Sequence, residues 1–324
     1  MNETSQDMKK IIIYILILAG ITFVVGLILY LSGLNVWFNY FFYDNAIMYS
    51  LFSLITQLGE TRIFIFLIVI VWYAYDKGFA KNLAYTVLGS GYVNNIAKDI
   101  FRDPRPPTNL RPLVTGDPVA EGFGFPSGHS QLSVSSYGYL AYEAYVKKSK
   151  IIFWIFTVLV YLIASSRIII GVHDLQDVWG GLTIGFIWII LFILLEPKVS
   201  KIISSYPLFV KLIWAVVLPI VLFVIGIFAF PDPTGDYGLI GGGMMGLAIG
   251  YLLESEYIKY DPRELKNIQR ILNLVIGIVI TLVLYLLLSF VFPESQIMDF
   301  VQYLILSFLL VTVVPWLFTK INRK

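Results

Sequence analysis

The feature that most constrains this chain is a series of apolar runs, each long enough to cross a lipid bilayer. Between Ile11 and Phe318 the sequence alternates such runs with short polar connections. Because a hydrocarbon core about 30 Å thick requires roughly 20 apolar residues per helix, each run predicts a transmembrane helix. Helices satisfy their backbone hydrogen bonds within one segment, as lipid requires. We therefore predict an all-α, polytopic membrane helical bundle.

Composition agrees with this prediction, since 58% of the residues are hydrophobic and only 14% are charged, far from the balance of a soluble domain. The apolar runs predict ten spans, at residues 11–32, 62–76, 80–97, 128–146, 151–167, 176–195, 210–230, 237–253, 271–292 and 298–318. The segment 45–59 is better interpreted as an interfacial amphipathic helix. We expect a six-helix core over residues 1–200 and a four-helix extension over 201–324.

Basic residues suggest the orientation, because cytoplasmic loops are enriched in Lys and Arg. With the N-terminus inside, all but six of the 23 Lys and Arg residues fall on the cytoplasmic side. The six exceptions are Arg62, Lys98, Arg102, Arg105, Arg111 and Arg167. Five of them lie in two outer loops, 98–127 and 167–176. A cluster of cations on the disfavoured side, next to membrane helices, indicates a binding site for an anion.

The two histidines of the chain belong to the same two regions. His129 stands in "GFPSGHSQ" and His173 in "SSRIIIGVHDLQD". One loop joins the third and fourth predicted spans and the other joins the fifth and sixth, so both lie on the same membrane face in either orientation. We therefore expect His129 and His173 to meet.

This constellation suits phosphoryl transfer. Lys98, Arg105 and Arg167 offer positive charge for the phosphate oxygens, and arginine adds a forked pair of N–H donors. Ser127 and Gly128 precede a helix, where exposed N–H groups and a bare backbone favour an anion.

The histidines divide the remaining chemistry between them. Asp177 lies four residues after His173, on the same helical face, and can hold one imidazole nitrogen so that the other attacks phosphorus. His173 is therefore the predicted nucleophile and His129 the general acid.

Three motifs carry a family resemblance: "KDIFRDPRP" from Lys98 through Arg105 to Pro106, "PSGH" from Pro126 to His129, and "SRIIIGVHDLQD" with Ser166, Arg167, His173 and Asp177. The chain resembles the type 2 phosphatidic acid phosphatase superfamily, which includes lipid phosphate phosphatases, undecaprenyl diphosphate phosphatases and glucose-6-phosphatases. The resemblance implies a six-helix core over about residues 10–196 and a phosphohistidine mechanism without metal. It assigns phosphate binding to Lys98, Arg105, Arg167, Ser127 and Gly128. Arg102, Arg111 and Ser166 are candidates for a supporting role.

Alternative interpretations exist for several of these residues. Ser127 is also a suitable helix cap, and Asp177 could cap the first turn of its helix. A metal held by His129, His173, Asp174 and Asp177 is disfavoured because the neighbouring cations would repel it. We expect no metal and no cofactor. The chain has no cysteine, which excludes thiolate chemistry.

We expect an integral membrane phosphatase that hydrolyses a phosphorylated lipid: isoprenyl diphosphate, phosphatidic acid or a related lipid phosphate. A soluble sugar phosphate is a less favoured substrate. A phosphotransferase using the same histidine intermediate is the main alternative, and a transporter is a weaker one because no inverted repeat is visible. The bilayer is the expected environment, a nucleic-acid partner is not expected, and the oligomeric state is left open. We predict a prokaryotic plasma membrane, both termini cytoplasmic and the active site on the extracytoplasmic face.

Overall fold

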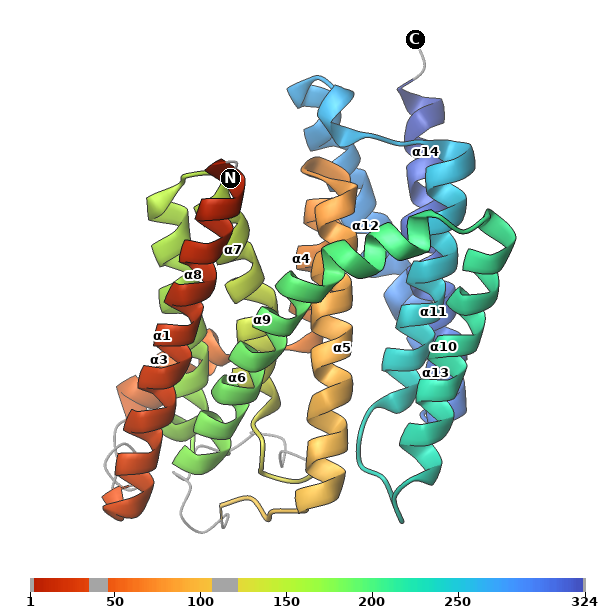
Figure 1. Cartoon of the computed structure of the whole chain (residues 1–324). Helices are drawn as coiled ribbons and strands as arrows, with labels where there is room; N and C mark the ends of the chain where they lie inside the picture. Colours follow the sequence, from red (N-terminus) through yellow and green to blue (C-terminus); the bar gives the residue numbers. More distant parts are fainter. Residues whose placement is uncertain (1–2, 35–45, 107–121, 323–324) are drawn as a thin grey trace. The chain divides into compact units, whose positions relative to one another are not determined.

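The computed structural model describes residues 3–34, 46–106 and 122–322, which contain helices and no strand (Figure 1). Its contacts divide the chain into two compact units. The first combines Met1–Phe64 with Val93–Glu196, and the second combines Ile65–Tyr92 with Pro197–Lys324. The predicted boundary near residue 200 between core and extension stays a prediction. The second unit also takes residues 65–92 from the N-terminal part of the chain.

The N-terminal part of the chain, up to the long helix α9, contains eight α-helices and one π-helical turn among its described residues. They are α1 (Glu3–Leu31), α3 (Ala46–Gln57), α4 (Thr61–Ala74), α5 (Lys77–Phe101), α6 (Gly128–Ser133), η2 (Val134–Gly138), α7 (Tyr139–Val146), α8 (Lys150–Ile169) and α9 (Leu175–Ser204). Helices α4, α5 and α9 each run from one unit into the other.

The C-terminal part is a second series of helices, connected by short turns. It consists of α10 (Leu208–Phe228), α11 (Tyr237–Leu253), η3 (Glu254–Ile258), η4 (Pro262–Glu264), α12 (Asn267–Val291), α13 (Gln296–Phe308), η5 (Leu309–Val313) and α14 (Val314–Ile321). Helices α10, α11 and α13 run side by side in this unit (Figure 1).

All ten predicted spans are helical, but seven of the described helices are long and apolar enough to cross a membrane. An eighth arises if α3 and α4, which are bent by 48° at their junction, form one span. The predicted spans 80–97 and 128–146 correspond to α5 and to α6 through α7, which fall outside the seven. Asparagine, serine and lysine side chains in these helices lower their apolar character, and the polar groups serve the site described below.

Glycines bring α9 and α6 into close contact in the first unit. A Cβ atom on Gly185 would lie 2.9 Å from the carbonyl oxygen of Gln131, and one on Gly181 would lie 2.5 Å from that of Ser127. Because glycine has no side chain, the two backbones approach each other directly. The N–H of Ser127 also donates to the carbonyl of Asp177 at 2.9 Å. The helix that begins at Gly128 is thereby fixed beside the first turn of α9.

The turn between α3 and α4 is fastened to the same unit. Tyr137 donates its hydroxyl hydrogen to the carbonyl oxygen of Leu58 at 2.8 Å. Gly59 is buried, and a Cβ there would lie 2.6 Å from Cδ2 of His129 and 2.9 Å from Cγ2 of Ile163. The α3–α4 turn therefore packs against the His129 imidazole with no room for a side chain at Gly59.

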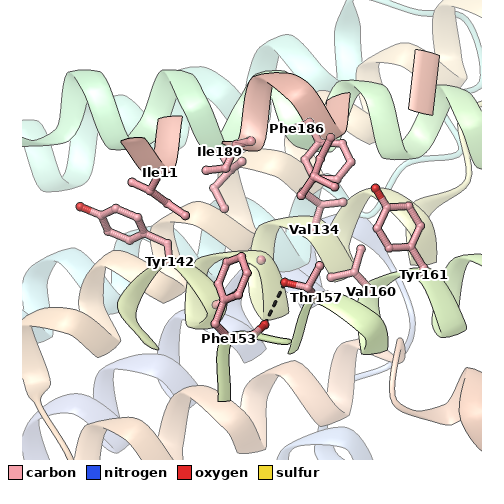
Figure 2. Close-up of a pocket in the computed structure, with 13 residues that line it drawn as sticks. Ile11, Val134, Tyr142, Phe153, Thr157, Val160, Tyr161, Phe186 and Ile189 are labelled. Atoms are coloured by element: carbon pink, nitrogen blue, oxygen red, sulfur yellow. Dashed lines mark hydrogen bonds between the residues drawn. The ribbon is translucent and has the colours of Figure 1, made fainter. Parts of the chain in front are cut away.

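A pocket lies deeper in the first unit, between α1, α7, α8 and α9. Ile11, Tyr142, Phe153 and Ile189 are among its lining residues (Figure 2). Its free volume is about 30 Å³, enough for a water-sized group. The pocket is too small for a lipid chain, and none of the predicted phosphate-binding residues lines it.

In the second unit, the glycine-rich segment 238–250 is the contact surface of α11. Gly238, Gly242 and Gly246 lie directly against the backbone of α13, where a Cβ atom would clash. The spacing of four residues places them on one face of the helix. Small residues on this face thus allow α11 and α13 to pack closely.

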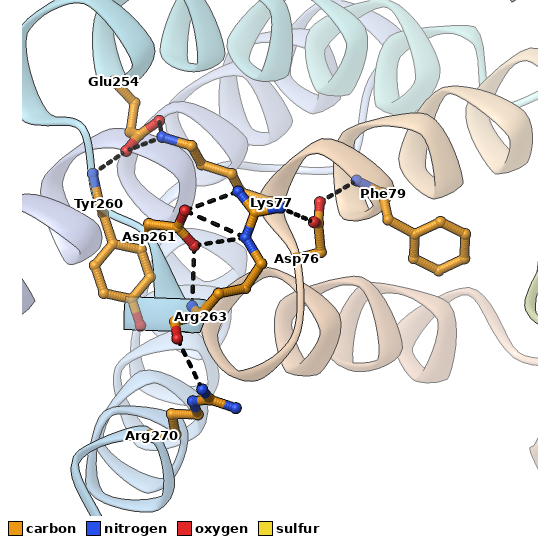
Figure 3. A network of polar contacts seen from close by, with 8 residues as sticks. All are labelled: Asp76, Lys77, Phe79, Glu254, Tyr260, Asp261, Arg263 and Arg270. Atoms are coloured by element: carbon orange, nitrogen blue, oxygen red, sulfur yellow. Dashed lines mark hydrogen bonds and ion pairs between the residues drawn. The ribbon is translucent and has the colours of Figure 1, made fainter. Parts of the chain in front are cut away.

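Charged side chains form a network in the second unit, where α4 ends and α5 begins (Figure 3). Lys77 Nζ pairs with Glu254 at 2.9 Å, and Glu254 also accepts a hydrogen bond from the Tyr260 N–H at 2.7 Å. Arg263 pairs with Asp76 at 2.9 Å and with Asp261 at 2.8 Å. Lys77 and Arg263 therefore each have a carboxylate partner.

Candidate active site

The first element of the site is a buried pair formed by His173 and Asp177. Nδ1 of His173 lies 3.0 Å from Oδ2 of Asp177, and the two side chains are 2% and 0% exposed. The same carboxylate oxygen accepts the Asp174 N–H at 3.1 Å. His173 belongs to the short connection between α8 and α9, and Asp177 lies in the first turn of α9. The four-residue spacing brings the two together, as expected.

The second nitrogen of His173 faces a cation. Nη1 of Arg105 lies 2.9 Å from Nε2 of His173, and the same guanidinium donates to the carbonyl oxygens of Val172 at 3.1 Å and Gly122 at 3.0 Å. A guanidinium only donates hydrogen bonds. Nε2 must therefore be the acceptor, and Nδ1 carries the hydrogen that Asp177 accepts. This tautomer leaves a lone pair on Nε2, which points toward the Arg105 guanidinium.

Two more predicted cations complete the cluster. Lys98, near the end of α5, donates to the carbonyl oxygen of Phe123 at 2.7 Å. Arg167, near the end of α8, is 7% exposed and donates to the hydroxyl of Thr56 at 2.7 Å. Carbonyl and hydroxyl acceptors are neutral, so these bonds orient the cations without cancelling their charge.

Positive charge at this site affects His173 directly. Burial, and then the charges of Arg167, Arg105 and Lys98, hold the pKa of His173 well below its usual 6.5. An imidazolium would be unfavourable in this surrounding. His173 is therefore neutral at physiological pH, which is the form that a nucleophile requires.

Ser127 and Gly128 lie at the start of α6, as expected. The Ser127 side chain caps the helix by accepting the Ser130 N–H at 3.4 Å and the Ser130 hydroxyl hydrogen at 3.0 Å. Gly128 lies against Asn94, whose Oδ1 would be 3.2 Å from a Cβ at this position. The capping role considered for Ser127 is thus present in the structure.

His129 stands on the first turn of α6. Its Nε2 lies 3.5 Å from Oε1 of Glu60, in the α3–α4 turn. Arg167 and Arg105 act electrostatically on His129 as well as on His173. The structure thus brings both histidines into the field of the same two arginines, although they come from separate loops.

Two of the weaker candidates, Arg102 and Ser166, make local contacts. Arg102 donates from Nε to the Asp99 carbonyl at 3.2 Å and places its guanidinium 5.6 Å from the centre of the Phe123 ring. Ser166 donates to the Ile163 carbonyl of its own helix at 2.6 Å. Arg111 lies outside the described residues.

Several residues of the site were not foreseen from the sequence. Thr56 comes from the segment interpreted as interfacial and Glu60 directly follows it. Asn94 bonds to the Pro126 carbonyl at 3.2 Å and to Gln131 at 2.9 Å. The sequence feature that could have pointed to Glu60 is its proximity to Arg62, since both are charged residues at the edge of an apolar run. Neither belongs to the three motifs, so nothing in the sequence tied them to the histidines.

A metal site has no geometric basis in the described part of the chain, where no three His, Cys, Asp or Glu side chains are grouped as ligands would be. Asp174, considered as a ligand, accepts from the Gln176 side chain at 3.4 Å.

Comparison with known protein families gives two matches along the chain. Residues 79–201 match the PAP2 superfamily, and residues 239–324 match the transmembrane extension of PAP2 superfamily phosphatases. The first match includes all three motifs. The second match falls in the part of the chain for which the sequence offered no motif.

Two curated proteins are similar. Phosphatidylglycerophosphatase B of Bacillus subtilis (strain 168) is 32% identical over 157 residues, which cover 45% of this chain and 74% of that protein. Lipid phosphate phosphatase delta of Arabidopsis thaliana is 28% identical over 198 residues, 57% of this chain but only 47% of that protein.

Among solved structures, a PAP2-type phosphatidylglycerolphosphate phosphatase from Bacillus subtilis aligns with 59% of this chain and 96% of its own, at 24% identity and a TM-score of 0.44. The family match over the motif-bearing segment and the 32% identity over most of a curated relative agree with the residues assembled around His173. The chain therefore belongs to the PAP2 superfamily, and it is an integral membrane phosphatase.

Proposed function

We propose that this protein hydrolyses the phosphate of a membrane lipid through a phosphohistidine intermediate on His173. The observation that carries the proposal is the buried Asp177–His173 pair, with the Nε2 lone pair facing the cation cluster. The two relatives are a phosphatidylglycerophosphatase and a lipid phosphate phosphatase, which supports a lipid phosphate as substrate.

The resting structure indicates how the phosphate would be received. Arg105 stands 2.9 Å from Nε2 of His173, so an incoming phosphate dianion would draw this guanidinium onto its oxygens and free the lone pair. Lys98 and Arg167 would neutralise the remaining phosphate charge. Arginine N–H groups contact two oxygens at once, which orients the phosphorus for attack from one side.

In the first step, Nε2 of His173 attacks phosphorus and the bond between phosphorus and the leaving oxygen breaks. His129, protonated, gives its proton to that oxygen, so the lipid alcohol departs as a neutral molecule. A lipid diphosphate would release the lipid monophosphate in the same way. Asp177 accepts the Nδ1–H throughout and stabilises the positive charge that the imidazole acquires.

In the second step, a water molecule attacks phosphorus and passes a proton to His129. The nitrogen–phosphorus bond breaks, its electron pair returns to Nε2, and inorganic phosphate leaves. Both histidines recover their initial protonation states. No step requires a metal or a cofactor.

The candidate substrates are phosphatidylglycerol phosphate, phosphatidic acid and isoprenyl phosphates or diphosphates, with glucose 6-phosphate as a soluble counterpart. We would measure phosphate release by the detergent-purified protein from each of them, with EDTA present. We expect release from at least one lipid, and a loss of at least about 1,000-fold in His173→Ala. Unchanged turnover in His173→Ala would overturn the assigned nucleophile.

The same assay separates hydrolysis from transfer. A phosphotransferase would release little phosphate to water and would respond to added alcohol or lipid phosphate acceptors. Release that does not depend on an acceptor supports the phosphatase. Loss of activity in EDTA, restored by a divalent cation, would contradict the metal-free mechanism.

The proposal includes the location of the site on the extracytoplasmic face of a prokaryotic plasma membrane, with both termini in the cytoplasm. The distribution of Lys and Arg supports this orientation. The chain has no cysteine, so single cysteines report topology directly. We expect a membrane-impermeant thiol reagent to label Asp232→Cys on intact cells, and Ser205→Cys only after lysis. Both positions are exposed. The reverse pattern would invert the orientation.

A further inference from the structure

The strongest unassigned feature of the first unit is the position of Glu60. Its Oε1 lies 3.5 Å from Nε2 of His129, with the two side chains 35% and 20% exposed. At 3.5 Å this contact is longer than an ordinary hydrogen bond. Such contacts between catalytic groups are often long before substrate binds and tighten in the reactive complex.

The α3–α4 turn holds Glu60 at this place through three separate contacts. The Leu58 carbonyl accepts the Tyr137 hydroxyl hydrogen, Gly59 packs against the His129 imidazole, and Thr56 accepts from Arg167. Each contact joins the turn to a residue on α6 through α8. Glu60 is therefore placed by the same packing that places the phosphate-binding arginine.

The two histidines then have matching environments. Asp177 accepts the Nδ1–H of His173 and leaves Nε2 for phosphorus. Glu60 faces Nε2 of His129 and leaves Nδ1 for the leaving oxygen. In each pair a carboxylate engages one nitrogen of the imidazole, which fixes which nitrogen reacts.

Resting on the function proposed above, we propose that Glu60 is the positioning residue of the general acid: its carboxylate orients His129 and favours the imidazolium form when the phosphate dianion is bound, with Nδ1–H directed at the leaving group. In the first step, Nδ1 gives its proton to the leaving oxygen while Nε2–H stays with Glu60. In the second step, Nδ1 takes a proton from the attacking water. Glu60 remains ionised throughout.

The electrostatic need for such a residue follows from the surrounding charges. The charged groups that act on His129 are Glu60 from the α3–α4 turn, Arg167 from α8 and Arg105 from the loop after α5. Burial of the ring and both arginines oppose a positive imidazole, and Glu60 favours it. Without this carboxylate, the arginines proposed to bind phosphate would disfavour the protonated form of His129, which supplies the proton to the leaving group.

The test compares two leaving groups in Glu60→Gln. A lipid alcohol needs a proton to leave, whereas p-nitrophenolate leaves readily without one. We expect kcat/KM for the lipid phosphate to fall by about 10- to 100-fold, which is part of the rate enhancement that general acid catalysis typically gives. With p-nitrophenyl phosphate we expect less than a three-fold change. The basic limb of the kcat/KM pH profile should move to lower pH, because the imidazolium loses its stabilising charge.

Three further variants complete the experiment. Glu60→Asp keeps the charge and should recover part of the lipid activity, and it carries the test if Glu60→Gln does not fold. Glu143→Gln, a carboxylate farther along the chain on α7, should leave both activities unchanged. In a His129→Ala background, Glu60→Gln should have no further effect, since coupled residues are not additive.

An equal loss with both substrates, or an unmoved basic limb, would show a structural role and overturn the proposal. Full lipid activity in Glu60→Gln would overturn it as well. Failure of the proposed function has another signature: the unmodified protein would release no phosphate from any substrate, or His173→Ala would remain active.

Discussion

The cations of the active site and those of the network in the second unit have different partners. Lys98 and Arg167 donate to a carbonyl and a hydroxyl oxygen, whereas Lys77 and Arg263 pair with carboxylates (Figure 3). A hydrogen bond to a neutral acceptor orients a cation without itself neutralising it, while an ion pair with a carboxylate does neutralise it. The first arrangement suits the anion site that we propose, and the second connects helices.

This difference separates function from stability. Removing a charge from the network should lower the free energy of unfolding and leave the catalytic activity intact. Removing a charge from the active site should impair the chemistry and leave the fold intact. The following variants test the separation, in order of decreasing effect.

Glu254→Gln should destabilise the second unit most. The Glu254 side chain is fully buried and Lys77 is 19% exposed, so the substitution leaves a lysine charge with little solvent. Breaking a buried pair in this way costs about 3 kcal/mol or more of unfolding free energy. Thermal unfolding in detergent measures this change, with the exposed Glu256→Gln as the control. An unchanged midpoint, or a large loss of activity per folded molecule, would contradict the separation.

Arg167→Lys should lower phosphate release by about 100-fold, the effect of removing one oriented donor from a developing charge. Lysine keeps the charge but cannot supply the forked N–H pair. The thermal midpoint should change little, because lysine retains most of the stem. Arg263→Lys, the same substitution in the network, should retain full activity. Near-normal turnover in Arg167→Lys would argue against direct phosphate binding.

Lys98→Met should change the pH dependence as well as the rate. Burial and then the nearby cations lower the pKa of His173, and a lowered pKa keeps the imidazole neutral below pH 6.5. The acid limb of kcat/KM in the unmodified protein should therefore lie below pH 6.5. Removing one cation should move this limb upward, toward 6.5. The control Lys201→Met should leave the acid limb of kcat/KM unchanged. If Lys98→Met also leaves it unchanged, Lys98 does not contribute to the electrostatic field at His173.

Arg263→Ala should have the smallest effect. The Arg263 side chain is 63% exposed, and exposed ion pairs contribute little because solvent screens them. We expect no measurable change in the thermal midpoint or in phosphate release. A clear loss of stability would mean that the network acts as a unit and that its exposed part is as important as Glu254.

Sequence patterns predicted the His173–Asp177 contact better than the number of spans. The four-residue spacing of His173 and Asp177 defined their contact, since helix geometry places residues four apart on one face. The number of spans was less well predicted. Helices α5 and α6 carry Asn94, Lys98 and several serines, so they are less apolar than the helices that are long and apolar enough to span a membrane.

The sequence by itself determined the membrane fold and the family, and it singled out both histidines as candidate site residues. These features depend on the length of the apolar runs and on the local spacing of the motif residues. Only the tertiary structure decided the rest of the site. Glu60 reaches it from the α3–α4 turn, Thr56 from the end of α3, and Asn94 from α5. Their contacts join residues 32 to 111 positions apart in the chain. No local periodicity encodes such a contact, since it depends on which helices the glycines of α9 allow to pack together.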